Sequence, residues 1–198
     1  MKLFLVRHGQ TAWTVAKRYQ GTTDIPLNQE GIRQAQAIAR ILRRERPTRL
    51  YTSTLQRTRQ TGHWIAKACG MKSIKDSRLN ELDFGKWEGS YYDGLLQTGG
   101  EPFKEWREGK LAKPPGGESL ASLARRVGQF LKELLRHHSE ETVVVVSHGG
   151  PIKMFLLEML KIPFCSLWSF RIEPASICLI EGNKYLLQIV WTNRTDHL

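Results

Sequence analysis

The chain has 198 residues, of which 40% are hydrophobic, and a formal net charge of +11 at pH 7. That length is enough for one sizeable hydrophobic core and short for two, so we expect a single domain. No apolar run approaches the roughly 18 residues that a membrane-spanning helix needs, and Arg7 interrupts the N-terminal apolar run too early for a signal peptide, so we expect a soluble, cytoplasmic protein without a membrane partner.

Charge and cysteine patterns argue against two classes of partner. Although the net charge invites a nucleic-acid interpretation, the 30 Lys and Arg are scattered, and their densest run, 40–49, has no interleaved aromatic residues. Such a run is typical of a solvated helix end, so we expect no nucleic acid partner. The three cysteines lack C-x-x-C spacing, and no H-E-x-x-H or clustered Cys and His set is present. The sequence therefore predicts no metal and no cofactor.

The first predicted element is a short apolar run within residues 3–11 that ends in Arg7, His8, Gly9 and Thr11. This pattern predicts a buried strand with a cation and an imidazole at its C-terminal end, where a parallel sheet binds ligands. An arginine fork matches phosphate or carboxylate oxygens, and histidine can act as acid, base or nucleophile. On these residues alone, a surface cation and a hydrogen-bonded loop histidine are an equal alternative.

Loop, helix and strand then alternate. Residues 13–27 lack clear periodicity and predict a loop, after which Asn28 is expected to cap a helix. A stripe of apolar side chains marks the buried face of that helix: Ile32, Ala35, Ile38, Ala39 and Leu42. Residues 50–52 predict a second strand, followed by a helix that is expected to begin at a Ser53 cap and to end at Gly70.

Residues 72–118 form the least regular part of the chain. Between 84 and 106 lie six of the 18 aromatic residues: Phe84, Trp87, Tyr91, Tyr92, Phe103 and Trp106. This enrichment predicts a cap or a pocket wall, so we treat 84–118 as a cap-like insertion in a single domain that spans 1–198. A satellite hydrophobic cluster beneath a long loop is an equally good interpretation.

Helix and strand return in the C-terminal half. Ser119 is expected to cap a long amphipathic helix, and the β-branched run at 142–146 predicts a central parallel strand. Pro151 fits the first position of the next helix. Residues 175–181 and 184–191 predict two strands around a two-residue turn with glycine first. The order of elements predicts an α/β sandwich with this hairpin at one edge.

Two segments share one architecture, because His8 and His148 each follow a predicted buried strand and precede glycine. If the two strands are parallel neighbours, both imidazoles face the same crevice. Arg57, at the start of the helix after another strand, would point into that crevice as well. Together with Arg7 these side chains make a pocket suited to a dianionic phosphoryl group.

With these residues the sequence resembles the histidine phosphatase, or phosphoglycerate-mutase-like, superfamily over nearly its whole length. The resemblance rests on ordered motifs: Arg7-His8-Gly9-Gln10-Thr11, Gln20-Gly21 with Asp24, Pro26 and Leu27, Gly31 with Gln34-Ala35, residues 52–57 with Gln60-Thr61, Glu81 with Gly85-Lys86-Trp87-Glu88-Gly89, residues 114–119, and Ser147-His148-Gly149-Gly150. It implies a three-layer α/β sandwich with a mostly parallel central sheet, helices on both faces and an edge hairpin.

The resemblance also implies roles for individual residues. His8 would be the nucleophile that forms a phosphohistidine, and Arg7, Arg57 and His148 would hold the equatorial phosphoryl oxygens. Glu81 would protonate the departing alkoxide and then deprotonate the attacking water; local sequence alone favours an exposed, salt-bridging carboxylate there. Further phosphate or substrate contacts are implied at Thr11, Thr14, Gln20, Gly21 and Gly149. The family commonly has asparagine in place of Thr14, and proline and alanine in place of Thr54 and Thr58.

The expected activity is hydrolysis of a phosphomonoester, a small phosphorylated metabolite, by a metal-independent phosphatase. The compact middle segment favours a phosphatase over a cofactor-dependent mutase. The motif after Glu81, the Pro-Pro-Gly-Gly-Glu-Ser run and the residues at 193–198 are similar to small bacterial members, including α-ribazole phosphatases and broad-specificity phosphatases. We therefore include α-ribazole 5′-phosphate as one candidate substrate. Two alternatives stay open: cofactor-dependent phosphotransfer of the phosphoglycerate mutase type, and a non-catalytic phosphate-binding regulatory module. A homodimer is an open alternative for the assembly.

Overall fold

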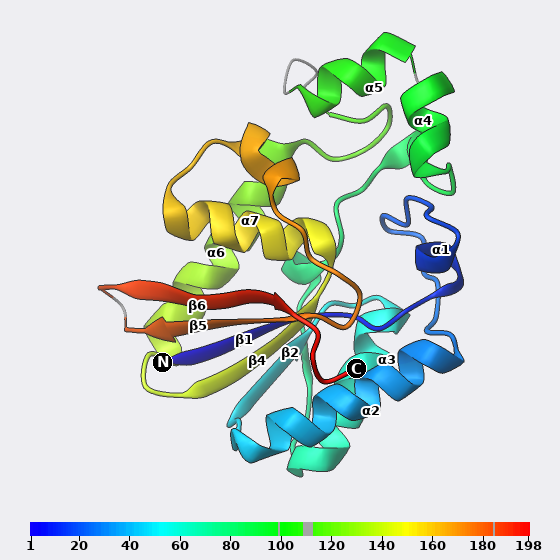
Figure 1. The fold of residues 1–198 in the computed structure, drawn as a ribbon. Helices are drawn as coiled ribbons and strands as arrows, with labels where there is room; N and C mark the ends of the chain where they lie inside the picture. The colour runs from blue at the N-terminus through cyan, green and yellow to red at the C-terminus, as the bar shows by residue number, and fades with distance from the viewer. Residues whose placement is uncertain (99, 109–112, 184) are drawn as a thin grey trace.

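The computed structural model describes residues 1–98, 100–108, 113–183 and 185–198. Within these residues a six-stranded sheet has the order β3-β2-β4-β1-β5-β6 (Figure 1). The strands are β1 (Lys2–Arg7), β2 (Arg49–Thr52), β3 (Ile74–Lys75), β4 (Thr142–Ser147), β5 (Ile177–Gly182) and β6 (Leu187–Arg194). β1 to β4 run parallel to one another, whereas β5 and β6 are antiparallel to their neighbours. The predicted three-layer α/β class is therefore confirmed.

The alternation of side chains along β1 builds a core on each face of the sheet. Leu3 and Leu5 pack with α6 (Leu120–His137) and α7 (Gly149–Leu160). Phe4 and Val6 pack with α2 (Gln29–Arg44) and α3 (Gln56–Cys69). Because successive side chains of a strand point to opposite faces, a fully apolar strand needs helices on both sides. Figure 1 shows the two helix pairs on opposite sides of the sheet.

The register of β1 and β4 brings the two predicted histidine segments together. Arg7 lies opposite Ser147 in the parallel ladder, and the backbone N–H of His8 donates to the carbonyl oxygen of Ser147 at 3.0 Å. His8 and His148 therefore both follow the carboxyl ends of the parallel strands. Ligands bind at these strand ends in open α/β sheets.

Two predicted helix starts are confirmed, and two are corrected. The side chain of Asn28 accepts from the N–H of Gly31, and Ser119 likewise caps α6. In contrast, α3 begins after Leu55 without a side-chain cap. α7 begins at Gly149, so Pro151 is its third residue and not its first, because His148 already has the extended backbone of an N-cap.

The predicted loop and hairpin also need correction. A short helix, α1 (Ala12–Val15), overlaps the start of the loop predicted for 13–27, because Thr11 and Thr14 make a reciprocal capping box. At the hairpin, β6 begins at Leu187, and residue 184, where the second strand is predicted to begin, lies outside the described residues. Asn183 accounts for the wider turn, since its side-chain oxygen accepts from the N–H groups of Tyr185 and Leu186.

The segment with many aromatic residues joins the core on the α6 and α7 side. It contains η2 (Gly85–Trp87), α4 (Tyr92–Thr98) and α5 (Gly100–Arg107), after the shorter η1 (Ser77–Leu79). Figure 1 shows α4 and α5 at the top of the view, above α1. The side chains of Phe84, Trp87, Phe103 and Trp106 are buried in one cluster with α6 and with η3 (Phe164–Ser169).

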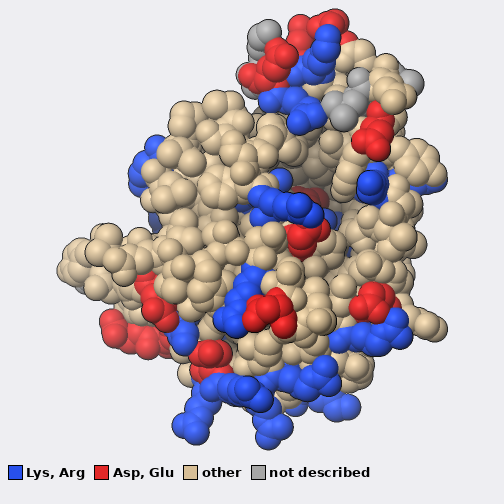
Figure 2. All heavy atoms as spheres, in the orientation of Figure 1, with Lys and Arg blue, Asp and Glu red and all other residues tan. Residues whose placement is uncertain are grey.

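The basic residues at 40–49 lie at an exposed helix end, as the sequence predicts. Figure 2 shows Lys and Arg gathered along the lower edge, over the C-terminal part of α2, where Arg43 and Arg44 occupy the last turn. Cations at this position are favourable because the helix dipole leaves a partial negative charge there. In the described part of the chain, no helix has the length and apolarity to cross a membrane.

Candidate active site

The two histidines lie side by side at the carboxyl ends of the parallel strands β1 and β4. Their ring centroids are 5.1 Å apart and the ring planes are inclined by 61°. Both side chains are buried, as is the side chain of Arg57 from the first turn of α3. Residues that are distant in sequence therefore meet at one point, with Arg7 beside them in the wall of a cavity.

The hydrogen bond of His8 decides which of its nitrogens is free. Nδ1 lies 2.8 Å from the carbonyl oxygen of Gly9. A carbonyl oxygen only accepts, so Nδ1 carries the proton and Nε2 has the lone pair in the neutral ring. Burial first, then the charges of Arg57 and Arg7, hold the pKa of His8 well below its ordinary value. The imidazole is thus neutral at pH 7, with a nucleophilic nitrogen available.

The second imidazole has the opposite tautomer. Arg57 Nε donates to Nδ1 of His148 at 3.2 Å, so Nε2 of His148 carries the proton and donates to Ser53 Oγ at 2.8 Å. Ser53 Oγ also accepts from the N–H of Leu55, and its own proton goes to Thr58 Oγ1 at 2.7 Å. Thr58 in turn donates to the carbonyl oxygen of Leu55 at 2.8 Å. Burial and the neighbouring charge of Arg57 lower the pKa of His148 as well.

Arg57 is held by the loop that precedes α2. Its Nη1 donates to the carbonyl oxygen of Thr23 at 2.9 Å, and its Nη2 donates to that of Gly21 at 2.7 Å. Gly21 has φ +53°, and a Cβ there would overlap the carboxylate of Glu88. That carboxylate accepts from the backbone N–H groups of Thr22 and Thr23, so it fixes the loop. Burial lowers the pKa of Arg57 to about 10, and the guanidinium stays charged at pH 7.

Arg7 has an unused donor beside the first turn of α7. Its Nη1 donates to the carbonyl oxygen of Ile172 at 2.5 Å. Its Nε is buried and has no hydrogen-bond partner among the described residues. A Cβ at Gly149 would lie 3.7 Å from the guanidinium carbon, so the start of the helix approaches the cation closely. An unpartnered N–H next to a helix N-terminus is an arrangement that suits an anion.

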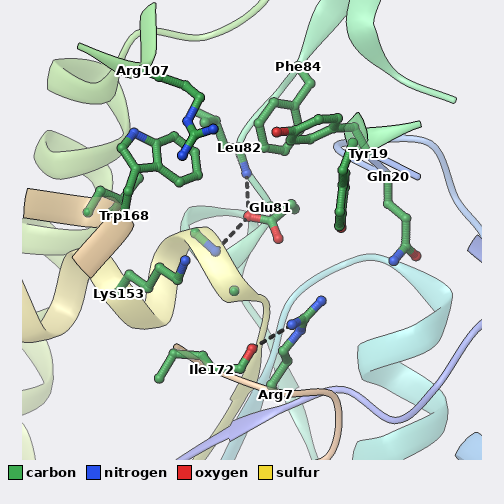
Figure 3. Close-up of a pocket in the computed structure, with 14 residues that line it drawn as sticks. Arg7, Tyr19, Gln20, Glu81, Leu82, Phe84, Arg107, Lys153, Trp168 and Ile172 are labelled. Atoms are coloured by element: carbon green, nitrogen blue, oxygen red, sulfur yellow. Dashed lines mark hydrogen bonds between the residues drawn. The ribbon is translucent and has the colours of Figure 1, made fainter. Parts of the chain in front are cut away.

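Glu81 lies in the wall of the cavity beside the first turn of α7, with Arg7 below it in the view (Figure 3). Its Oε1 accepts from the N–H groups of Leu82 and Gly150 at 2.9 and 3.0 Å, which leaves the other oxygen for a ligand. Arg126 of α6 donates to the carbonyl oxygens of Asn80 and Glu81 at 2.6 and 3.1 Å. The backbone that carries the carboxylate is therefore anchored to α6.

The remaining predicted contacts divide into two groups. Gln20 and Gly149 line the cavity, as Arg7 and Glu81 do. Gly21 and the buried His8, Arg57 and His148 are not among its lining residues. The structure does not bring Thr11 and Thr14 into that lining, because their hydroxyl groups cap α1: Thr11 Oγ1 accepts from the N–H of Thr14, and Thr14 Oγ1 accepts from that of Thr11. Thr11 Oγ1 also donates to Gln20 Oε1 at 3.1 Å, so its contribution to the site is indirect.

The cavity has a volume of about 300 Å³. Sequence reasoning missed several of its lining residues: Tyr19, Arg107, Lys153, Leu167 and Trp168. Lys153 had a signal that could have found it, since it lies one helical turn after Gly149 and Gly150 and shares their face. Arg107 and Trp168 come from segments without a local motif. In the described ranges no group of three or more His, Cys, Asp or Glu side chains could hold a metal ion.

Comparison with known sequences decides the family. The sequence profile of the histidine phosphatase superfamily (branch 1) matches residues 3–195. The chain belongs to this superfamily. The resemblance noted in the sequence is thus confirmed, and this histidine phosphatase is a phosphoric monoester hydrolase by family and fold.

Individual relatives differ in the substrate that they are named for. This histidine phosphatase is 37% identical to phosphoserine phosphatase 1 of Hydrogenobacter thermophilus over 199 residues, which cover 100% of this chain and 94% of the relative. A phosphoserine phosphatase mutant from Entamoeba histolytica, solved with phosphoserine, has a TM-score of 0.90 at 30% identity and covers 100% and 98% of the two chains. The α-ribazole phosphatase of Shigella flexneri has a TM-score of 0.87 at 27% identity, with coverage of 98% and 96%.

Proposed function

We propose that this histidine phosphatase hydrolyses a small phosphorylated metabolite through a phosphohistidine at His8. The observation that carries the proposal is the state of His8: a neutral ring, with the Nδ1 proton held by Gly9, beside two arginines. A neutral imidazole with its lone pair on Nε2 is ready to attack, whereas an imidazolium is not. The cations Arg7 and Arg57 would stabilise the charge that spreads over the equatorial oxygens.

The reaction is written in two steps. In the first, Nε2 of His8 forms a bond to phosphorus, the ester P–O bond breaks, and the leaving alkoxide takes a proton from the carboxyl of Glu81. In the second, Glu81 takes a proton from water, the oxygen attacks the phosphohistidine, and inorganic phosphate leaves with His8 restored. The second carboxylate oxygen of Glu81 faces the cavity (Figure 3), which supports its assignment as the proton donor and acceptor.

The size of the cavity bears on the leaving group. A volume of about 300 Å³ is at the lower end of the range for small-molecule sites. We therefore favour a leaving group of few heavy atoms over a benzimidazole riboside, the leaving group of α-ribazole 5′-phosphate. The aromatic side chains of Tyr19, Phe84 and Trp168 in the wall still justify including α-ribazole 5′-phosphate in a substrate panel.

The direct experiment is turnover of para-nitrophenyl phosphate by the wild type and by His8→Ala. We expect phosphate release by the wild type and a loss of at least about a thousandfold in the variant, because the unprotonated nitrogen of the neighbouring His148 already accepts from Arg57. Equal rates would contradict the proposal. Incubation with 3-phosphoglycerate, together with a trace of 2,3-bisphosphoglycerate as phosphoryl donor, separates the alternatives. Free phosphate indicates a phosphatase, 2-phosphoglycerate a mutase, and no reaction with any ester of the panel a non-catalytic module.

A further inference from the structure

We propose that Lys153 forms a subsite for a carboxylate on the leaving group, so that the enzyme selects small phosphomonoesters that also carry a carboxylate. Arg107 lies at the outer side of this subsite and adds a second cation. The inference rests on the proposed function, because it concerns the same cavity. It assigns a role to two cations that the phosphohistidine chemistry does not use.

The position of Lys153 places it beyond the phosphate end of the cavity. On α7, Gly149 approaches Arg7 and Gly150 donates to Glu81. Lys153 follows them by one turn on the same face, about 6 Å further along the axis for four residues. Figure 3 shows Lys153, Trp168 and Arg107 on the side of the cavity away from Gln20, with Glu81 between this group and Arg7.

The ammonium of Lys153 has no carboxylate of its own. The structure places no acidic side chain from the described ranges within ion-pair distance of its Nζ. Of the nearby carboxylates, Glu173 pairs with Arg171. Glu81 Oε1 accepts from two backbone N–H groups, and its other oxygen faces the cavity, where the proposed reaction uses it. Burial first, then the charge of Arg7, lowers the pKa of Lys153. A ligand carboxylate would satisfy a cation that the fold leaves unpaired.

Lys153 and Arg107 both contact the ring of Trp168, which places them on the same side of the cavity. The Nζ of Lys153 lies 5.4 Å from the centroid of the Trp168 ring, and the guanidinium carbon of Arg107 lies 6.0 Å from it. The indole itself packs against Trp106 at a centroid distance of 4.9 Å, so the wall is supported from behind. Contact with an aromatic face still leaves the N–H groups free to donate to an anion.

Charge balance favours a carboxylate over a second phosphate. Arg7 and Arg57 stand at the phosphate end, where a dianion is expected. Lys153 is a compact single charge close to the carboxylate of Glu81, so a monoanion matches it, whereas a second dianion would add repulsion. The cavity of about 300 Å³ limits the span between the two groups to a few carbons.

The test uses two esters that differ in one group, 3-phosphoglycerate with a carboxylate and glycerol 3-phosphate with a hydroxymethyl group in its place. We expect the wild type to prefer 3-phosphoglycerate in kcat/KM by about tenfold or more, as a charge-assisted hydrogen bond provides. Lys153→Met should remove most of that preference and Lys153→Arg should keep part of it. Lys132→Met, on the exposed face of α6, is the matched control and should leave the preference unchanged.

A binding measurement separates this inference from the proposed function. In His8→Ala, calorimetry should give tighter binding of 3-phosphoglycerate than of glycerol 3-phosphate, and adding Lys153→Met should make the two equal. Equal binding in His8→Ala, or an equal loss for both esters on adding Lys153→Met, would contradict the carboxylate subsite. Either result would leave the proposed function standing if His8→Ala still abolishes turnover of para-nitrophenyl phosphate.

Discussion

At the scale of single residues, hydrogen bonds give the two neighbouring imidazoles opposite tautomers. His8 has its proton on Nδ1, towards Gly9, whereas His148 has its proton on Nε2, towards Ser53. The Ser53 hydroxyl is fully used, because it accepts twice and donates to Thr58. Thr58 therefore helps to hold the ring of His148 in one orientation.

This chain of bonds predicts the effect of Thr58→Val, which keeps the volume and removes the hydroxyl. The buried Ser53 hydroxyl loses its acceptor, so the free energy of unfolding should fall by about 1 to 3 kcal/mol, and turnover should fall with it. Urea denaturation and steady-state kinetics measure both. Thr54→Val is the control, since the Thr54 hydroxyl is exposed and bonds to Asn80, and it should cost no more than about 0.5 kcal/mol. Equal losses in the two variants would argue against the role of Thr58.

At the scale of elements, the first turn of α7 determines where Glu81 lies. A Cβ at Gly150 would come within 2.4 Å of Glu81 Oε1, a distance that forces the carboxylate to move. On the other side of Glu81, Arg126 anchors the backbone and pairs with Glu118 at 2.8 Å. The carboxylate is thus positioned between two helices, α6 and α7. Substitutions in these two helices should therefore affect proton transfer by Glu81, although they lie far from it in sequence.

Gly150→Ala tests this positioning. We expect a loss on alkyl phosphates that exceeds the loss on para-nitrophenyl phosphate by about tenfold, because a nitrophenolate departs with little need of a proton. Gly128→Ala is the matched control, since a Cβ at that helical glycine meets nothing closer than 3.7 Å. An equal loss on both kinds of ester would mean that the substitution acts on the phosphate site and not on proton transfer.

Elements whose signals are local could be predicted from the sequence. Asn28 and Ser119 cap their helices through backbone groups three residues away, so local sequence suffices. Ser53 looked like a third cap, but its hydroxyl bonds to His148, 95 residues away. The same limit applies to Arg126. Its guanidinium donates to the carbonyl oxygens of Arg78, Asn80 and Glu81, which lie 45 or more residues away in the chain. Tertiary partners of this kind have no signature in the residues beside them.

At the scale of the whole molecule, basic side chains lie around the opening of a hollow in the surface. Figure 2 shows a hollow in the upper part of this face with Lys and Arg at its margin. An excess of cations around such a hollow raises the encounter rate with anionic esters. The apolar runs of β1 and β4 predict buried strands, and the family resemblance implies the helices on both faces. The placement of α4 and α5 was not predictable, because their aromatic residues pack through contacts that only the folded chain defines.

Two buried histidines should make the global stability depend on pH. In the folded protein the pKa values of His8 and His148 lie well below 6.5, through burial first and then the charge of Arg57. In the unfolded chain both histidines have the ordinary pKa of about 6.5. Their contribution to the free energy of unfolding is therefore fully present above pH 6.5 and is lost as the pH falls below it. Urea denaturation between about pH 8 and about pH 5 should reveal this loss. The slope should be smaller in His8→Asn; an identical slope would show that other groups cause it.

The most direct measurement is chemical trapping of the intermediate. Rapid quenching of the wild-type enzyme during turnover, followed by peptide mapping under alkaline conditions that preserve phosphohistidine, should find the phosphoryl group on the peptide that contains His8. It should be absent from the peptide that contains His148 and absent throughout in His8→Ala. A phosphoryl group on His148, or full turnover with no phosphohistidine on either peptide, would contradict nucleophilic attack by His8.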